Sequence, residues 1–310
     1  MRRKATLDDK VILILILAVV SISLFVPFGY YTLIPLVLVL LHQLLLRAIF
    51  RGPTKRSLPF SDTNWDVIKA NNNGADVYGF LRFHEEVSDL VVFIHGWQSS
   101  SEKFIERIKI FDEKGMHTLA IDMRGHGMAP STNEWTAGKV IQDVVTLLGQ
   151  IDSSRVKKVH FYGHSLGGFI CLGMNKDRHQ GWWKEKYGTL MLESPMVAFS
   201  PIMEEMSSRL SFMSPLIRRW AVKGFNKIHP EVGGLTWTDI DIPSWGLPTC
   251  PTLLLQAAND SRLGRYHYDL LMKQDLDIHP HLIDSLTHSK NRINEERDAI
   301  IRDWIEKMIL

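Results

Sequence analysis

A long apolar stretch near the N-terminus is the first feature of the hydrophobic pattern. From Val11 to Leu46 the chain has no Asp, Glu, Lys or Arg over 36 residues. A single helix of that length would extend about 54 Å, whereas the hydrocarbon core of a bilayer is about 30 Å thick and needs about 20 residues. Residues 26–31 (VPFGYY) combine Pro and Gly, which break helices, with Tyr, which favours the membrane interface. The pattern therefore predicts a transmembrane hairpin of two helices, at about 11–26 and 32–50, within an anchor of residues 1–50.

The charges around this stretch predict its orientation. Four basic residues come before the first predicted helix and four follow the second: Arg2, Arg3, Lys4, Lys10, Arg47, Arg51, Lys55 and Arg56. Because cytoplasmic loops carry an excess of Lys and Arg, we expect both ends of the hairpin, and the domain after it, in the cytoplasm. A cleaved signal peptide is the alternative, but a second apolar run follows at once and no clear A-x-A site is present. An interfacial amphipathic helix fits less well, because both runs are apolar on all sides.

After a polar linker at 51–62, short apolar runs alternate with segments of helical periodicity. The runs expected to be strands are 90–95, 117–122, 158–162, 189–192, 252–256 and 280–283. The expected helices are 104–114, 135–151, one directly after residue 168, and 294–310. Repeated strand–helix units indicate an α/β domain over residues 63–310, with a parallel sheet and helices on both faces. Residues 66–69 and 77–83 are expected to form antiparallel edge strands.

One segment, residues 196–248, interrupts this alternation. It is rich in Met and Trp and has a helical, irregular pattern between two strands. We expect it to form a helical cap over the carboxyl edge of the sheet. Most of its Met and Trp side chains would pack the core of the cap itself, and a few could line an apolar substrate cleft.

The strand at 158–162 leads into Gly163-His164-Ser165-Leu166-Gly167, a G-x-S-x-G motif. A motif of this kind between a strand and a helix is typical of a nucleophile elbow, in which the serine backbone is strained and its hydroxyl stands clear of the sheet. The two glycines allow the strand and helix to pass close together. We therefore predict Ser165 as a nucleophile.

A serine hydroxyl needs a base, and for this elbow the acid and then the histidine follow the serine in chain order. Asp260 comes directly after the strand at 252–256, and His288 lies between the last strand and the last helix. We predict that His288 takes the proton from Ser165 and that Asp260 orients the imidazole. The alternatives lie at less suitable positions: His279 and His281 for the base, and Glu193 and Asp284 for the acid.

Two glycine-containing loops follow the first strands of the alternating pattern. The backbone N–H of Trp97, in His95-Gly96-Trp97, is expected to join that of Leu166 as an oxyanion hole. His95 is expected to support this loop structurally. The second loop, residues 122–127 (DMRGHG), could resemble a charge relay or a metal cluster, but we interpret it as a Gly-rich loop held by an Asp–Arg pair.

Together the HGW, DMRGHG and GHSLGG segments and the positions of Asp260 and His288 resemble the α/β-hydrolase family over about residues 75–310. The similarity is nearest to esterases and to monoacylglycerol-lipase-like and lysophospholipase-like members. This resemblance implies an eight-stranded, mostly parallel sheet with a variable cap, and no cofactor. Dehalogenases and epoxide hydrolases of the family have Asp at the elbow, so Ser165 argues against both chemistries. The predicted hairpin lies outside the family's pattern.

Composition and charge exclude several other classes of protein. The 310 residues are 45% hydrophobic and 23% charged, which excludes a disordered chain. Cys171 and Cys250 lie in no Cys/His cluster, and neither a zinc motif nor a P-loop is present, so we expect no metal and no nucleotide. The net charge of +2 argues against nucleic acid as a partner. Residues 1–60 carry +6 and the remainder −4, so the basic residues report on the anchor rather than on the domain.

These observations predict a membrane-anchored serine hydrolase that cleaves carboxylic esters and needs no cofactor. The anchor and the Met- and Trp-rich cap favour a lipophilic substrate, such as a monoacylglycerol or a lysophospholipid. An acyltransferase or a thioesterase could use the same three residues. A non-catalytic binding protein on the same fold is disfavoured, because the serine, acid and histidine are all present in the expected order.

Overall fold

The computed structural model describes residues 3–54, 57–289 and 291–310. Arg2, Lys55 and Arg56, which contribute to the predicted orientation, lie outside the described residues. The chain divides into two compact units. The first comprises Met1–Gly52, Thr132–Thr136 and Met203–Trp237, and the second comprises Pro53–Ser131, Ala137–Ile202 and Thr238–Leu310.

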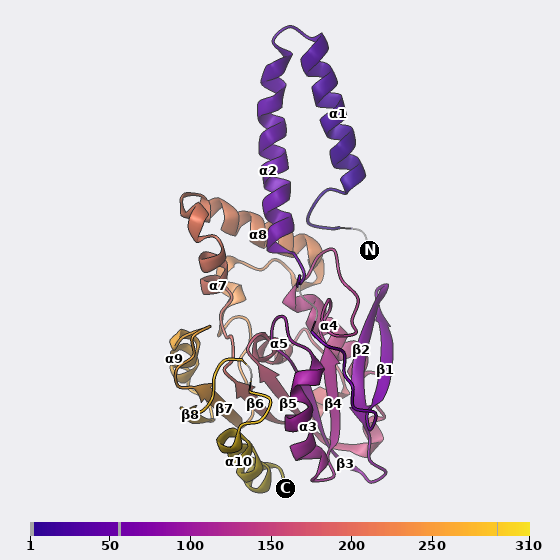
Figure 1. The fold of residues 1–310 in the computed structure, drawn as a ribbon, viewed down its shortest axis with the longest axis vertical. Coiled ribbons are helices and arrows are strands. Elements are labelled where there is room, and N and C mark those ends of the chain that lie inside the picture. Colours follow the sequence, from indigo (N-terminus) through magenta and orange to yellow (C-terminus); the bar gives the residue numbers. More distant parts are fainter. Residues whose placement is uncertain (1–2, 55–56, 290) are drawn as a thin grey trace. The chain divides into compact units, whose positions relative to one another are not determined.

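An eight-stranded sheet forms the centre of the second unit, in the order β1-β2-β4-β3-β5-β6-β7-β8 (Figure 1). The strands are β1 Asp66–Asn72, β2 Ala75–Arg82, β3 Ser88–Ile94, β4 His117–Asp122, β5 Val156–His164, β6 Tyr187–Glu193, β7 Thr252–Ala257 and β8 Ile278–Ile283. The pairs β1–β2 and β2–β4 are antiparallel, and the other five pairs are parallel. The predicted mostly parallel, eight-stranded α/β-hydrolase sheet is therefore confirmed.

The expectation of two edge strands before β3 is correct for β1 and wrong for β2. β2 lies between β1 and β4, and its register pairs Phe80 with Ala120 of β4. The physical reason is burial, because Val77 and Phe80 are both almost fully inaccessible to solvent. An apolar strand of this kind is stabilised by neighbours on both sides, whereas the more exposed β1 can form the edge.

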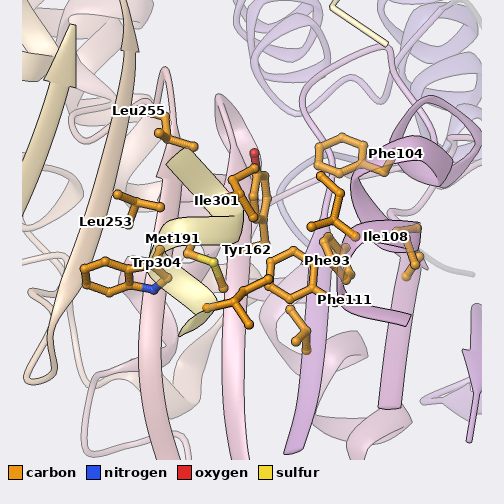
Figure 2. Close-up of a cluster of buried hydrophobic side chains, with 14 of the residues drawn as sticks. Phe93, Phe104, Ile108, Phe111, Tyr162, Met191, Leu253, Leu255, Ile301 and Trp304 are labelled. Carbon is orange, nitrogen blue, oxygen red and sulfur yellow. The ribbon is translucent and has the colours of Figure 1, made fainter. Parts of the chain in front are cut away.

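Helices pack on the sheet around apolar clusters. The helices of this unit are α3 Ile105–Asp112, α4 Ala137–Leu148, α5 Leu166–Met174, α6 Trp182–Glu185, α9 Tyr266–Met272 and α10 Glu295–Trp304. Short 3-10 turns at Ser101–Phe104 and Ser153–Arg155 precede α3 and β5, and a π turn at Ile305–Ile309 follows α10. Figure 2 shows one cluster, in which Phe111 of α3 and Ile301 of α10 pack with strand residues such as Phe93 and Tyr162.

The side chains of neighbouring β5 residues point to opposite faces of the sheet, because side chains alternate along a strand. Tyr162 belongs to the cluster with α3 and α10, whereas Phe161 stacks on Tyr187 and contacts the edge of Trp183. β5 is thus covered by apolar side chains on both sides, and only its carboxyl end is available to project a reactive side chain.

The first unit contains a helical hairpin (Figure 1). α1 spans Asp9–Phe25, a 3-10 turn spans Gly29–Thr32, and α2 spans Leu33–Ile49. These bounds agree with the two predicted helices to within two residues. Among the described residues, one continuous helical segment, Gly29–Ile49, which joins the 3-10 turn and α2, is long and apolar enough to cross a membrane, with 21 residues. α1 has 17 residues and falls short of that length. Insertion of both helices stays a prediction.

The same unit contains α8, Ser214–Ile228, preceded by a 3-10 turn at Ser208–Met213 and followed by another at Pro230–Val232. α8 approaches α2 closely at Gly224, where a Cβ atom would lie 2.6 Å from the ring of Phe50. Ile228 and Leu46 complete this small apolar core. A Cβ atom at position 224 would therefore require the ring of Phe50 to move.

The segment predicted to form the cap, residues 196–248, includes α7 (Ser200–Met206), α8 and a 3-10 turn at Trp237–Ile240. Its residues are divided between the two units, with a boundary inside α7. The part in the second unit is held by Asp241, whose carboxylate accepts hydrogen bonds from the backbone N–H groups of Phe199 (2.7 Å) and Ser200 (2.9 Å). The role of this segment as a cap stays a prediction.

Candidate active site

Ser165 lies at the sharp turn between β5 and α5. Its backbone has φ 52° and ψ −118°, a conformation that is costly for any residue with a Cβ atom. Two hydrogen bonds hold it there: its N–H donates to the carbonyl of Glu193 (3.0 Å), and its carbonyl accepts from the N–H of Met196 (2.9 Å). The neighbouring strand β6 and the loop after it thus enforce the strain that lifts the hydroxyl from the sheet.

The glycines of the motif allow the close approach of strand and helix. A Cβ atom on Gly167 would lie 1.9 Å from the carbonyl oxygen of Ile94, and one on Gly163 would lie 2.7 Å from the carbonyl of Gly167. Both distances are impossible for a side chain, so these positions can hold only glycine without moving β3 or α5. The sequence-based reason for the two glycines matches this geometry.

The structure brings Ser165, His288 and Asp260 together. His288 Nε2 lies 3.0 Å from Ser165 Oγ, and His288 Nδ1 lies 2.8 Å from Asp260 Oδ2. Each of the three residues is 8–9% exposed. With Nδ1–H donating to the carboxylate, Nε2 is free to accept the serine proton, which is the tautomer that a general base needs. The arrangement can therefore transfer a proton from the Ser165 hydroxyl to His288.

The topology explains why residues so distant in sequence meet. Ser165, Asp260 and His288 follow β5, β7 and β8, which lie in parallel on one side of the sheet. The carboxyl ends of parallel strands share one edge of the sheet, where functional side chains of α/β proteins gather.

Backbone hydrogen bonds position the carboxylate of Asp260 for its contact with the imidazole of His288. Its Oδ1 accepts hydrogen bonds from the backbone N–H groups of Arg262 (2.8 Å) and Leu263 (2.9 Å), which leaves Oδ2 for His288. Burial raises the pKa of this carboxyl, but the hydrogen bonds from His288 and from the two N–H groups outweigh burial and lower the pKa overall. Asp260 is therefore ionised at neutral pH.

Glu193, the alternative acid, has other partners. Its two oxygens accept hydrogen bonds from Arg107 Nε (2.7 Å) and Nη2 (2.6 Å), and the Tyr162 hydroxyl donates to the same carboxylate. Burial raises the pKa of Glu193, but the Arg107 charge and its hydrogen bonds lower it far below its usual range. The structure thus places Glu193 in a buried ion pair rather than against His288.

Among the described residues, none of the remaining alternatives makes a hydrogen bond with Ser165 or His288. Asp284 is exposed. His279 Nε2 lies 3.1 Å from Asp277 Oδ1, and its ring contacts that of Trp304. His281 lies on β8 itself, in register with Leu255 of β7.

His164, to which sequence reasoning assigned no role, contacts the loop that carries the base. Its Nε2 lies 2.8 Å from the backbone carbonyl oxygen of His288. Burial lowers the pKa of His164 to about 4, so the neutral ring donates its Nε2–H to that carbonyl. The position directly before Ser165 was visible in the sequence, but its partner, 124 residues away, could be found only from the fold.

The two residues predicted to form the oxyanion hole lie on either side of the serine. Leu166 is the first residue of α5, where backbone N–H groups have no partner within the helix. Trp97 follows Gly96, and a Cβ atom on Gly96 would lie 3.2 Å from the Cβ of Ser165. The loop after β3 therefore passes directly beside the serine. The oxyanion role of the two N–H groups stays a prediction.

His95 fixes that loop. Its Nε2 accepts a hydrogen bond from the N–H of Met123 (3.1 Å), so its Nδ1–H donates to the carbonyl of Gly96 (2.8 Å). Burial lowers the pKa of His95 to about 4, and the ring is neutral. The ring joins the loops after β3 and β4, which agrees with the structural role expected for it.

The expected ion pair within residues 122–127 is wrong in its partners. Asp122 accepts hydrogen bonds from the backbone N–H groups of Ser101 (2.8 Å) and Met128 (2.9 Å), so the loop folds around its carboxylate. Arg124 instead reaches α4 and binds Asp143 through two hydrogen bonds of 2.5 and 2.6 Å. Backbone donors in a tight loop are closer to Asp122 than a long side chain is, which leaves Arg124 free for the helix. Among the described residues, no group of three His, Cys, Asp or Glu is placed to hold a metal ion.

Comparison with known proteins gives one family match. The family model described as "Serine aminopeptidase, S33" matches residues 85–239, half of the chain. This range includes Ser165 but neither Asp260 nor His288.

Three curated relatives match shorter segments. The chain is 29% identical over 98 residues to a serine hydrolase-like protein of Dictyostelium discoideum, covering 32% of the chain and 27% of that protein. It is 31% identical over 113 residues to protein phosphatase methylesterase 1 of Candida albicans, covering 36% and 31%. It is 31% identical over 105 residues to putative esterase/lipase 2 of Mycoplasma pneumoniae, covering 34% and 37%. The chain thus spans about a third of the length of the curated relatives it matches.

Solved structures are similar over most of the chain. An esterase of Pyrococcus furiosus has a TM-score of 0.59 at 14% identity, covering 84% of this chain and 98% of that one. Alpha/beta hydrolase domain-containing protein 10 from mouse has a TM-score of 0.58 at 18% identity, covering 78% and 99%. At these identities the likeness establishes the fold alone.

Proposed function

Since the chain belongs to the serine aminopeptidase S33 family and has the α/β-hydrolase fold, we propose that it is a membrane-anchored serine hydrolase of carboxylic esters. Ser165, His288 and Asp260 are the proposed catalytic residues. The observation that carries the proposal is the chain of two hydrogen bonds, 3.0 and 2.8 Å, that joins the strained serine through His288 to an ionised Asp260.

The proposed reaction has two steps. Ser165 Oγ attacks the acyl carbonyl while His288 Nε2 takes its proton, and His288 then protonates the departing alcohol. Asp260 holds the imidazole and stabilises its charged form. The N–H groups of Leu166 and Trp97 would bind the tetrahedral oxyanion. Water, activated by His288, then releases the acyl group from the serine.

An ester is the favoured substrate among those that this chemistry could cleave. The relatives include proteins named as an esterase/lipase and a methylesterase. The family description names an aminopeptidase, and a carboxylate would be a suitable partner for the free amine of such a substrate. Asp260 and Glu193, the two carboxylates beside the elbow, both already accept two or more hydrogen bonds from protein groups. Because both carboxylates are already engaged by protein groups, we do not expect either of them to bind a substrate amine, and we favour an ester.

The membrane part of the proposal rests on the hairpin. α1 and α2 expose large apolar side chains along most of their length, and aromatic residues are exposed at the turn between them. These include Leu13, Ile14, Leu17, Leu24, Ile34, Val37, Leu38 and Leu41 on the helices, and Phe28, Tyr30 and Tyr31 at the turn. An apolar surface of this kind with interfacial aromatics suits a lipid environment. We propose that both ends of the hairpin, and the hydrolase unit, lie on the cytoplasmic side.

A membrane anchor would hold the hydrolase next to lipid molecules, so we propose a lipophilic ester such as a monoacylglycerol or a lysophospholipid. An acyltransferase or thioesterase reaction would use the same residues, with an alcohol in place of water or a thioester in place of the ester.

A substrate panel tests this function on the detergent-solubilised full chain. Esters of increasing acyl length, a monoacylglycerol, a lysophospholipid, a thioester and an amino-acid anilide would be compared for wild type, Ser165→Ala and His288→Ala. We expect ester cleavage that rises with acyl length and is lost in both variants. Preferred cleavage of the anilide, or equal ester cleavage by wild type and Ser165→Ala, would contradict the proposal. Products formed with added glycerol separate acyl transfer from hydrolysis.

A further inference from the structure

α8 of the first unit has one exposed, positively charged face. Arg219, Lys223 and Lys227 follow one another at intervals of four residues, and all three are exposed. Residues four apart lie on one side of a helix, so the three cations form a line about 12 Å long. The opposite side is buried through Ile217, Ala221, Gly224 and Ile228. The helix is therefore fixed in its rotation, and the cations cannot turn inward.

These three charges are not neutralised within the part of the chain that the structure describes. The neighbouring Arg218 has a partner, Glu204 at 2.6 Å, and lies over the ring of Trp237. No described acidic side chain makes an ion pair with Arg219, Lys223 or Lys227. The helix dipole stabilises a positive charge in the last turn of a helix. This explains the position of Lys227 but not those of Arg219 and Lys223.

A small cavity adjoins this face, between α8 and α2. It has a volume of about 100 Å³ and is lined by Ala5, His42, Leu46, Trp220, Lys223, Gly224 and Lys227. The ring of Trp220 meets that of His42 edge-on, with centroids 4.6 Å apart. Two lysines, a histidine and a tryptophan thus line one small, mostly apolar opening, and the flexible lysine side chains could donate hydrogen bonds to an anionic group there.

The cavity lies where α2 changes from apolar to polar. The helix exposes apolar side chains through Leu41 and again at Leu44, whereas His42, Gln43 and Arg47 bring polar groups into its last two turns. Gln43 accepts a hydrogen bond from the N–H of Leu7 (2.7 Å), and Arg47 makes an ion pair with Asp9 (2.5 Å). If α2 crosses the bilayer, these turns lie at the depth of the lipid headgroups on the proposed cytoplasmic side.

Exposed apolar side chains accompany the cations. Phe212, in the turn before α8, is 80% exposed, and Leu216 in the first turn of α8 is 40% exposed. Exposed cations beside exposed apolar side chains on one segment suit contact with the anionic surface of a membrane. The combination suits a phospholipid better than a free anion, since phosphate alone gains nothing from Phe212 and Leu216.

We propose that α8 and the C-terminal half of α2 bind the phosphate-bearing headgroup of an anionic phospholipid, with Lys223 and Lys227 as the principal contacts. This inference rests on the membrane part of the proposed function and adds a lipid preference to it. Anionic lipid would be bound even by a chain whose Ser165 is inactive, because the two sites share no residue.

The test is a titration of the full chain in a neutral detergent. Soluble dioctanoyl phosphatidylglycerol, dioctanoyl phosphatidylcholine and inorganic phosphate are the three probes, and tryptophan fluorescence, to which Trp220 contributes, reports binding. The test variant is Lys223→Gln/Lys227→Gln. The matched control is Lys157→Gln/Lys273→Gln, which removes two exposed lysines from the second unit. The charge-conserving variant Lys223→Arg/Lys227→Arg completes the set.

We expect phosphatidylglycerol to bind more tightly than the other two probes. A lysine near an anionic lipid surface accounts for about five-fold in affinity, so the test variant is expected to bind about 30-fold more weakly. The control and the arginine variant should bind within two-fold of wild type. Equal affinity for phosphatidylglycerol and phosphatidylcholine would overturn the proposal, as would equal losses in the test and control variants. Inorganic phosphate binding as tightly as the lipid would show a free-anion site instead and would also overturn it.

Two further measurements separate this proposal from the proposed function. Incorporation of wild type into vesicles of pure phosphatidylcholine tests the anchor without any anionic lipid. Labelling by a fluorophosphonate tests the serine, and unchanged labelling of the lysine variant also shows that it is folded.

Discussion

Asp260 and Glu193 are the two carboxylates beside the elbow. Loss of the Glu193 charge is expected to lower the stability of the fold, whereas loss of the Asp260 charge is expected to lower turnover. Glu193 is fully buried and binds Arg107 through two hydrogen bonds, whereas Asp260 binds His288. In Glu193→Gln the shape is kept, but Arg107 is left as a buried cation without its counter-charge. In Asp260→Asn the amide cannot hold the histidine tautomer that accepts a proton from Ser165.

The two substitutions are expected to change different properties of the protein. Breaking one partner of a buried ion pair costs about 3–5 kcal/mol of folding free energy. At about 2–4 °C for each kcal/mol in a domain of this size, Glu193→Gln should lower the melting temperature by about 10 °C. Asp260→Asn should instead lower kcat by about 10⁴, the loss known for the same exchange in a serine protease, with little change in the melting temperature.

The effect of pH on Glu193 has a defined sign. Its pKa in the folded protein lies below the ordinary value of 4.5, so its contribution to stability is complete above pH 4.5 and is lost as the pH falls below it. Wild type should therefore lose stability on acidification from pH 5 to pH 3 more steeply than Glu193→Gln, which has no carboxylate to protonate at this site.

The assay combines thermal unfolding of the detergent-solubilised chain with ester turnover at a temperature where both variants are folded. The amount of folded protein is taken from the amplitude of the thermal unfolding transition, so that turnover refers to folded enzyme even in a variant that reacts slowly. Near-normal stability of Glu193→Gln with lost turnover, or near-normal turnover of Asp260→Asn, would refute the assignment and make Glu193 the catalytic acid.

Three other changes have clear expected outcomes. Gly167→Ala should abolish expression of folded protein, because its Cβ atom would lie 1.9 Å from the carbonyl oxygen of Ile94; soluble, active protein in detergent extracts would contradict the close packing of the elbow. His164→Ala removes the hydrogen bond to the His288 carbonyl and should lower kcat by about ten-fold, with KM and the melting temperature less affected, a loss of about 1.4 kcal/mol; an unchanged kcat would show that the loop holds His288 without it. A reporter fused after Leu310 should be protected from externally added protease in intact cells, and its digestion would contradict the predicted orientation of the hairpin.

The positions of the reactive residues could be predicted because strand ends carry a clear signal. Ser165, Asp260 and His288 each follow an apolar run, and the chain order of the three left few alternatives. Parallel strands bring their carboxyl ends together, so local pattern was enough to place all three at one edge of the sheet.

The contacts that hold this edge in place could not be predicted. Arg107 and Glu193 are 86 residues apart, and His164 and His288 are 124 residues apart, so no local pattern connects them. Arg124 shows the same difficulty, since the acidic residue nearest in sequence, Asp122, is engaged by backbone N–H groups instead. Side-chain partners depend on how the strands are ordered, and the sequence alone did not reveal that β2 lies inside the sheet.

Covalent labelling shows whether the Ser165 hydroxyl is the nucleophile. The full chain in detergent would be treated with a fluorophosphonate, digested, and the modified residue identified by mass spectrometry. We expect one adduct, on Ser165 of the wild type, no labelling of Ser165→Ala and slow labelling of His288→Ala. Equal labelling of wild type and Ser165→Ala, or an adduct on another residue, would contradict the assignment of Ser165 as the nucleophile.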